Sequence, residues 1–236
     1  MKSVIFLLSL VLVGCKDRTC TLKKEAWPEI RGVKLGMKYD QVLANYPKLP
    51  ALQQDRYGVS EIIFESGLEL GEASEPNSVA YSYRDSGSIF GSTVRALVIS
   101  ADSYPQLKDV RQLHVAFVDG QVAKVLVFYQ NELNWTSIDA FASQSIVKLG
   151  LPADASWKMS SDKQSQYLTC TNFTEKSVDS LSVDLGFKKL SYLSADTFPY
   201  IEIKDFTADM KTFGRKQDEE KAEKQRQEEK QKQFQP

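Results

Sequence analysis

The chain has 236 residues, of which 42% are hydrophobic and 11% are aromatic, which is enough to bury the core of one large or two small domains. Its 30 basic and 31 acidic residues give a net charge of −1. Proteins that bind nucleic acid usually carry a basic excess, so this balance argues against a nucleic-acid partner.

The amino-terminal segment MKSVIFLLSLVLVGC places Lys2 ahead of an apolar run from Val4 to Val13. A helix needs about 20 residues to cross a bilayer, so this shorter run predicts a cleaved secretory signal rather than a span. Its end, Leu12-Val13-Gly14-Cys15, resembles the lipobox of bacterial lipoproteins. The resemblance implies that residues 1–14 are a signal peptide, that the sulfur of Cys15 receives a diacylglyceryl group, and that the new amino terminus is acylated.

Several acyl chains hold a protein firmly on a membrane, whereas one chain gives only marginal binding. The residue after the cysteine is Lys16 rather than aspartate, which by the same resemblance favours the outer membrane, facing the periplasm. A plain signal peptide, or a buried helix with a chance cysteine at position 15, are the alternatives.

Two further cysteines follow, Cys20 and Cys170. If Cys15 carries lipid, these two remain as an even pair, and an exported protein enters an oxidising compartment. We therefore predict a Cys20–Cys170 disulfide that ties the region behind the anchor to the distant half of the chain. The alternative is a pair of free thiols, with Cys170 buried in a strand.

Residues 15–29 are expected to form a lipidated linker, and residues 30–134 a first unit of helix and strands. A short helix is predicted because apolar residues recur at i, i+3, i+4 and i+7, namely Tyr39, Val42, Leu43 and Tyr46. Pro47 and Pro50 should end it. Extended runs separated by Gly- and Ser-containing turns predict strands at 59–64, 79–84 and 94–100.

The clearest local pattern is VRQLHVAFV-DG-QVAKVLVFY, residues 110–129. Asp119-Gly120 between two β-rich runs is typical of a type I′ hairpin, and a two-residue turn predicts pairs whose numbers sum to 239. In that register one face is bulky and apolar, and we expect it to meet the helices. The other face is mixed, and we predict a partner-binding surface there from Gln112, His114, Val125, Val127 and Tyr129, with burial under residues 51–109 as the alternative.

A second unit is predicted over residues 135–210. Thr136 is expected to cap a helix whose buried face carries Ile138, Phe141, Ala142, Ser145 and Leu149, and Gly150 and Pro152 to end it. Two strand pairs should follow, 167–173 with 178–185 and 190–193 with 200–204. Residues 211–236 mix basic, acidic and glutamine side chains without an apolar stripe, which predicts a charged tail, either disordered or a solvated helix.

The stretch Val33-Lys34-Leu35-Gly36-Met37-Lys38-Tyr39-Asp40-Gln41-Val42-Leu43 resembles the entry motif of the SmpA/OmlA lipoproteins, small components of the β-barrel assembly machinery, and of the tandem units of β-lactamase inhibitor proteins. The resemblance implies an α+β fold, with helices packed on one face of an antiparallel sheet, in two tandem helix-plus-strands units, and a habit of binding proteins. Lys38 stands where a Ser or Thr helix cap is usual, so the cap must come from elsewhere.

No motif in the sequence indicates catalysis, a metal or a cofactor. His114 is the single histidine, and no HExxH, CxxC or phosphate-binding glycine loop is present. We therefore predict a lipid-anchored binding or scaffold protein of the cell envelope that acts through protein–protein contact. A periplasmic carrier or sensor with a small-ligand or lipid cavity between sheet and helices is one alternative. A hydrolase using two carboxylates is another, because such pairs need no local spacing.

Overall fold

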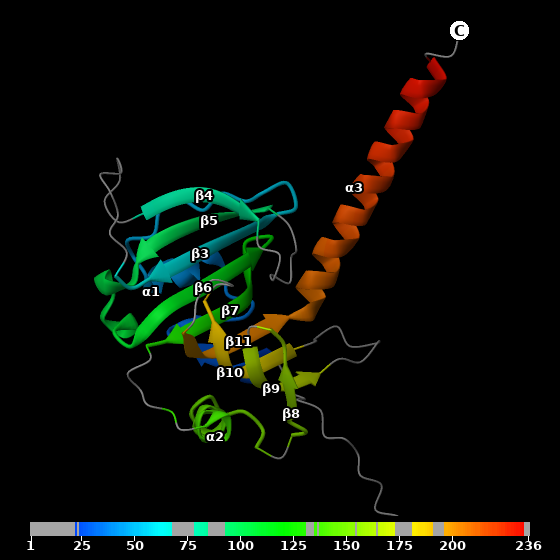
Figure 1. Ribbon diagram of the computed structural model, residues 1–236. Helices are drawn as coiled ribbons and strands as arrows, with labels where there is room; N and C mark the ends of the chain where they lie inside the picture. The colour runs from blue at the N-terminus through cyan, green and yellow to red at the C-terminus, as the bar shows by residue number, and fades with distance from the viewer. Residues whose placement is uncertain are drawn as a thin grey trace, which may run out of the picture.

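The structure is a computed structural model that describes residues 22, 24–67, 78–84, 93–130, 135, 137–153, 155–163, 165–172, 181–190 and 196–233, with the backbone alone at 78–84, 93–95, 172 and 233. Cys15, Cys20 and Thr136 lie outside this set. The described strands β3 to β11 form one nine-stranded sheet in the order β4-β5-β3-β6-β7-β11-β10-β9-β8 (Figure 1). All neighbours are antiparallel except β3 and β5, which run parallel.

The strands have the following bounds: β3 Val59–Glu65, β4 Ser78–Arg84, β5 Thr93–Ser100, β6 Val110–Val118, β7 Gln121–Tyr129, β8 Lys158–Ser161, β9 Ser165–Asn172, β10 Leu181–Lys189 and β11 Thr197–Asp205. A separate two-stranded ribbon is formed by β1 (Glu29–Ile30) and β2 (Val33–Lys34). The helices are α1 (Tyr39–Asn45), α2 (Ile138–Lys148) and α3 (Phe206–Gln233), and the 3₁₀ turns are η1 (Lys24–Ala26), η2 (Ala101–Ser103) and η3 (Pro105–Leu107).

The β6–β7 hairpin forms at the predicted turn, and Asp119 and Gly120 both have positive φ, at 52° and 76°, as a type I′ turn requires. The predicted register holds next to the turn and again at the pair Val110–Tyr129, but the pairs between them are shifted by one residue. Phe117 pairs with Val122, but Ala116 pairs with Lys124, so a β-bulge adds one residue to β7. Because side chains alternate along a strand, this bulge moves every later residue of β7 to the opposite face from the one predicted.

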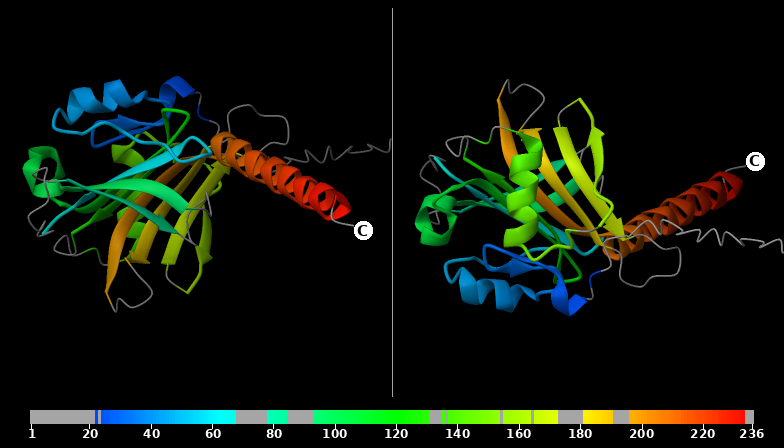
Figure 2. Two further views of the ribbon diagram at one scale, coloured as in Figure 1. Left: turned by 90° about the horizontal axis from the view of Figure 1, so that it is seen from above. Right: turned by 90° about the horizontal axis from the view of Figure 1, so that it is seen from below.

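The main core lies between one face of the sheet and the α1 and α2 helices with the β1–β2 ribbon. Figure 2 shows that the ribbon and α1 cover one part of this face and α2 covers another part. Gly36, at φ 81°, donates its N–H to the carbonyl of Val122 at 2.8 Å, which fixes α1 beside the hairpin. The cap of α1 does come from elsewhere, because the Gln41 side chain accepts a hydrogen bond from the Lys38 N–H at 2.8 Å.

The α2 helix begins one residue later than predicted. Ser137, not Thr136, is its N-cap, and its hydroxyl accepts a hydrogen bond from the N–H of Ala140 at 3.2 Å. The helix ends as predicted at Gly150, which has φ 64°. Leu151 donates its N–H to the carbonyl of Ile146 at 2.9 Å, and Gly150 donates to Val147 at 3.2 Å, which together make a Schellman motif.

The charged tail is helical where the structure describes it. The α3 helix continues directly from β11 at Phe206 and runs to Gln233, five residues upstream of the predicted start at 211. Its first turns lie against the end of the β6–β7 hairpin, and its last turns project away from the sheet (Figures 1 and 2). Every described side chain from 220 onward is exposed.

The predicted α+β class is confirmed, with a mostly antiparallel sheet; α1 and α2 pack on one face of it, whereas the base of α3 contacts the other face through Ala208. The strand pair β9–β10 also matches the prediction where it is described. The 200–204 segment, however, belongs to β11, which pairs with β10 and β7. Because β7 of the first predicted unit pairs with β11 of the second, both predicted units contribute strands to one sheet. The division into tandem units stays a prediction. Among the described residues, no helix has the length and apolar character that a membrane span requires.

Candidate functional site

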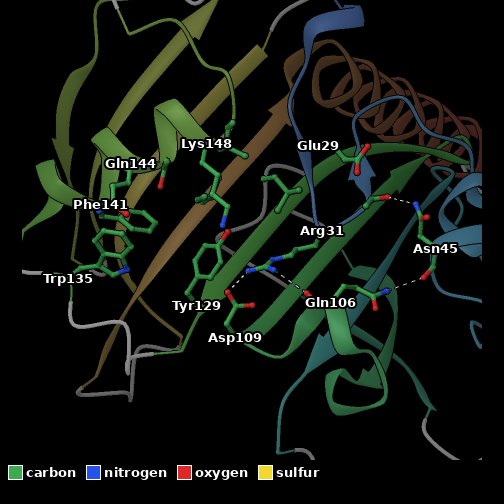
Figure 3. A pocket seen from close by; sticks show the side chains of 15 residues that line it. Glu29, Arg31, Asn45, Gln106, Asp109, Tyr129, Trp135, Phe141, Gln144 and Lys148 are labelled. Atoms are coloured by element: carbon green, nitrogen blue, oxygen red, sulfur yellow. Dashed lines mark hydrogen bonds and ion pairs between the residues drawn. The ribbon is translucent and has the colours of Figure 1, made fainter.

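A pocket of about 600 Å³ opens between α2, the β1–β2 ribbon and the sheet face beneath them (Figure 3). We call it the α2 pocket. Its size falls in the range of small-molecule sites. Segments far apart in the sequence contribute its lining, which consists of Glu29, Ile30, Arg31, Gly32, Asn45, Gln106, Asp109, Tyr129, Trp135, Phe141, Gln144, Ser145, Lys148, Leu149 and Ile201.

Arg31 organises one wall of the pocket. It lies at the first position of the β1–β2 turn with φ 54°, a left-handed conformation that costs a non-glycine residue roughly 1–2 kcal/mol. Its guanidinium donates to a carboxylate oxygen of Asp109 at 2.5 Å and to the carbonyl of Gln106 at 3.2 Å. It also lies 5.5 Å from the ring centroid of Tyr129. These contacts stabilise a strained backbone at the rim of a cavity, as is common at functional sites.

The turn that carries Arg31 is also held from behind by α1. The hydroxyl of Tyr46 donates to the Arg31 carbonyl at 2.6 Å, and the amide of Asn45 donates to the Gly32 carbonyl at 2.7 Å. The amide of Gln106 in turn donates to the Asn45 carbonyl at 3.1 Å. The position of Arg31 in the pocket is therefore set by side chains at the end of α1 that bind the carbonyls of its turn, and Figure 3 shows the Asn45–Gly32 and Gln106–Asn45 hydrogen bonds.

Tyr129, at the end of β7, lies at the floor of the pocket. Burial raises the pKa of its phenol, and the nearby Arg31 guanidinium opposes this shift only in part. The phenol is therefore a neutral hydroxyl at physiological pH, able both to donate and to accept a hydrogen bond.

An aromatic wall faces Arg31 across the pocket. The rings of Trp135 and Phe141 meet edge to face with centroids 5.3 Å apart, and Phe187 of β10 lies behind Phe141 at 5.9 Å. The indole nitrogen of Trp135 is buried and has no hydrogen-bond acceptor in the part of the chain that the structure describes. A buried donor without an acceptor costs about 1–3 kcal/mol, so an acceptor for this nitrogen would stabilise the protein.

The residues predicted to form one partner surface are separated by the β7 bulge. Gln112 and His114 lie on the sheet face opposite the helices, beside Lys124. Val125 and Val127 are buried in the main core, with exposed fractions of 1% and 0%. Tyr129 lines the α2 pocket instead. The five residues therefore do not lie together on one face, because the hairpin register on which the predicted surface depended is wrong.

The cysteines give a partial result. Cys170 is buried in β9, while the predicted lipid attachment at Cys15 and the predicted disulfide partner Cys20 lie outside the described residues. The lipid attachment at Cys15 and the Cys20–Cys170 disulfide therefore stay predictions.

The sheet face opposite the helices carries a row of buried charges that crosses several strands. Lys204 of β11 lies 2.8 Å from a carboxylate oxygen of Glu202 and 3.6 Å from one of Asp184. Farther along, Glu61 of β3 has a carboxylate oxygen 3.3 Å from the Nδ1 of His114. Among the described residues, no group of three or more histidine, cysteine or acidic side chains is placed to hold a metal ion.

The two acids beside Lys204 differ in pKa. Burial raises the pKa of Asp184, with Lys204 opposing the shift. Burial acts the same way on Glu202, but Lys204, Lys124 and Lys188 outweigh it and lower its pKa to about 2. Shifted carboxyl pairs occur at catalytic centres and in structural ion-pair networks alike. The pairing of both acids with one lysine fits a structural network that allows charges to be buried in the sheet.

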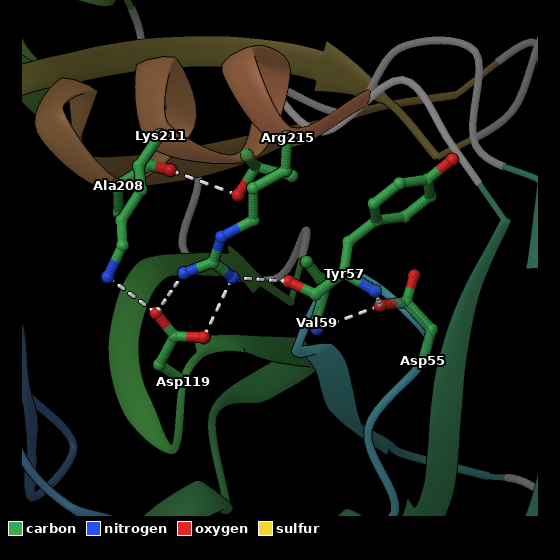
Figure 4. A network of polar contacts seen from close by, with 8 residues as sticks. Asp55, Tyr57, Val59, Asp119, Ala208, Lys211 and Arg215 are labelled. Atoms are coloured by element: carbon green, nitrogen blue, oxygen red, sulfur yellow. Dashed lines mark hydrogen bonds and ion pairs between the residues drawn. The ribbon is translucent and has the colours of Figure 1, made fainter. Parts of the chain in front are cut away.

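A second polar network fixes α3 to the body (Figure 4). Asp119, in the β6–β7 turn, accepts hydrogen bonds from both terminal nitrogens of Arg215, at 2.8 and 2.6 Å, and one from Lys211 at 2.6 Å. Arg215 also donates to the carbonyl of Tyr57 at 2.8 Å. These contacts, led by the Arg215 hydrogen bonds, hold the pKa of Asp119 well below its usual range.

Sequence reasoning did not find the α2 pocket. The one signal that pointed to it was Gly32, since glycine at the second position of a two-residue turn is common in hairpins. The pairing of Arg31 with Asp109 depends on long-range packing, which no local pattern encodes. Comparisons with protein-family models, with curated protein sequences and with solved structures find no match to this chain.

Proposed function

We propose that this chain is a lipid-anchored binding protein of the cell envelope that captures a small ligand in the α2 pocket. The observation that carries the binding function is the pocket itself, which combines an aromatic wall, a paired Arg31–Asp109 rim and a buried hydroxyl at Tyr129. Concave sites of this size, with a few fixed polar groups on an apolar lining, are typical of ligand recognition.

The anchor is supported by the sequence Leu12-Val13-Gly14-Cys15 and by the apolar run before it. Attachment at Cys15 would hold the folded part at the periplasmic side of the outer membrane. Replacing Cys15 by serine should release the protein from the membrane fraction and abolish incorporation of labelled palmitate. Retention of the Cys15→Ser protein in the membrane pellet would contradict the anchor.

The pocket can be tested in cells with a photo-crosslinking amino acid. Gln144 lines the pocket from α2, and Val147, which is 80% exposed on the same helix, does not line it. A crosslinker at position 144 should capture a specific small adduct, measured by intact-protein mass spectrometry, and the control at position 147 should not. Equal labelling at both positions, or none at 144, would contradict a binding role for the pocket.

A protein–protein scaffold is the second candidate, and the exposed half of α3 favours it. Residues 220–232 project from the body with all side chains in solvent (Figure 1). A crosslinker at Gln227 that yields a defined protein adduct, while one at Gln144 yields no adduct, would favour this function over ligand capture.

A further inference from the structure

The lining of the α2 pocket indicates the chemistry of its ligand, and the inference rests on the binding function proposed above. We propose that the pocket binds a neutral saccharide, recognised by its hydroxyl groups and by the apolar faces of its rings. Three features of the lining carry this: its charge balance, its amide groups and its aromatic wall.

The charges of the lining cancel. Two acidic side chains, Glu29 and Asp109, face two basic ones, Arg31 and Lys148, and the Arg31–Asp109 pair is closed at 2.5 Å. A site for a phosphate or another strongly anionic group would present an excess of basic donors. The balance therefore favours a ligand without net charge.

The remaining polar groups suit hydroxyls. Asn45, Gln106 and Gln144 each carry an amide with both donors and an acceptor. Two of these amides are held in place, since Asn45 donates to the Gly32 carbonyl and Gln106 to the Asn45 carbonyl. A hydroxyl also donates and accepts, so a polyhydroxylated ligand can satisfy fixed amide oxygens and the Tyr129 phenol together.

The aromatic wall provides the apolar surface on which a sugar ring can pack. Trp135 and Phe141 stand side by side opposite Arg31, and the nitrogen-bearing edge of the indole faces Tyr129 (Figure 3). That nitrogen is shielded by its neighbours and lacks an acceptor among the described residues. A small tilt of the indole toward the pocket it already lines would let a ligand hydroxyl oxygen accept its hydrogen bond.

The three tryptophans make a direct test possible. The indole N–H of Trp27 donates to the Leu22 carbonyl and that of Trp157 to the Pro152 carbonyl, both at 3.2 Å, while Trp135 has no such acceptor in the described part of the chain. The full chain, labelled with ¹⁵N-tryptophan in a detergent without a sugar headgroup, is titrated with chitotriose, maltotriose and cellotriose. We expect at least one trisaccharide to shift the Trp135 indole signal downfield and saturably, while the other two signals stay in place.

Two variants check that the shift reports binding in the pocket. Trp135→Phe identifies the signal and should weaken saccharide binding by about two- to tenfold, the usual effect of losing one hydrogen bond. Gln144→Ala should also weaken binding, and Ser143→Ala, on an exposed part of α2 outside the lining, should leave it unchanged. Equal affinities for Gln144→Ala and Ser143→Ala would overturn the assignment even if Trp135→Phe does not fold.

Palmitate and glucose 6-phosphate complete the panel and separate the two proposals. If either one shifts the Trp135 signal saturably and no trisaccharide does, the saccharide is wrong but the pocket still binds ligands. If no compound shifts it at millimolar concentration, the saccharide is wrong. Absence of an adduct at position 144 in cells would then remove the binding function as well.

Discussion

Asp119 and Arg215 are 96 positions apart in the sequence and meet through two parallel hydrogen bonds, where the β6–β7 turn touches the third turn of α3. This bidentate contact joins the charged helix to the body of the protein. The other contacts at the α3 base include the Lys211–Asp119 hydrogen bond, the exposed Arg56–Glu219 ion pair at 3.3 Å, and a small apolar contact of Ala208 with the cluster around Val59 and Val118.

Replacing Arg215 by alanine should therefore loosen α3 without unfolding the sheet. We expect a loss of about 1 kcal/mol in the free energy of unfolding, because the pair is partly exposed and screened by water. Amide hydrogen exchange should rise in residues 206–219. Arg226→Ala is the control, since Arg226 lies 3.9 Å from Glu223 on the free part of the helix. Equal exchange in the two variants would show that the Asp119 contact does not fix α3.

The same pair should keep its effect across the neutral and mildly acidic range. The pKa of Asp119 is held below its usual value, so its contribution to stability is fully present above pH 3.8, the ordinary value, and is lost only as pH falls through the lower folded value. Hydrogen exchange at residues 206–219, corrected for intrinsic rates, should stay constant from pH 7 to pH 5. A rise over that interval would contradict a carboxylate clamp.

Protonation of Glu202 should lower the stability of the protein at acid pH. Its pKa of about 2 lies below the ordinary value of 4.5, so its contribution is present above pH 4.5 and is lost as pH falls toward 2. Asp184, whose pKa is raised, acts in the opposite sense. In urea denaturation the native protein should lose more stability between pH 4.5 and 2 than Glu202→Gln does. The exposed Glu228→Gln should behave like the native protein, and parallel curves for all three would refute the prediction.

Two glycines should respond oppositely to alanine. A Cβ at Gly186 of β10 would lie 2.1 Å from the Gln166 carbonyl oxygen, whereas a Cβ at Gly214 of α3 would meet nothing within 4 Å. Gly186→Ala should cost more than about 3 kcal/mol or prevent folding, because backbone must move. Gly214→Ala should stabilise by about 0.5–1 kcal/mol through helix propensity. Thermal melts of both variants decide this, and a tolerated Gly186→Ala would mean that the β9–β10 pairing differs.

Val127→Asp separates the two hairpin registers. In the structure Val127 is fully buried among the core residues of β7, so a carboxylate there should cost several kcal/mol and abolish cooperative folding. In the register predicted from the sequence it would lie on a mixed face, where the change would be mild. Gln112→Ala, on the opposite face, should fold normally by circular dichroism, and a well-folded Val127→Asp protein would favour the simpler register.

Local patterns predicted most of the elements and the pairs β6–β7 and β9–β10, but not the register inside the hairpin or the order of the strands in the sheet. The Asp119-Gly120 turn, the α1 face around Val42 and the stop at Gly150 were all predictable, because each depends on contacts within a few residues. The bulge near Ala123 was not, since neither strand carries a glycine or proline to mark it, and the predicted surface failed with it. The α2 pocket was missed for a related reason, because Arg31 and Asp109 are brought together only by the packing of the ribbon against the loop before β6.

The sheet ends in β8, a strand of only four residues, Lys158–Ser161, paired along one side with β9. No described strand pairs with its other side, and an unpaired edge on a long flat strand would template pairing with another chain. A strand of four residues can form few hydrogen bonds with another chain, and Lys158 adds a charge that would be costly to bury. A short edge strand thus limits edge-to-edge aggregation. Lengthening β8 with alternating valines should make the protein aggregate.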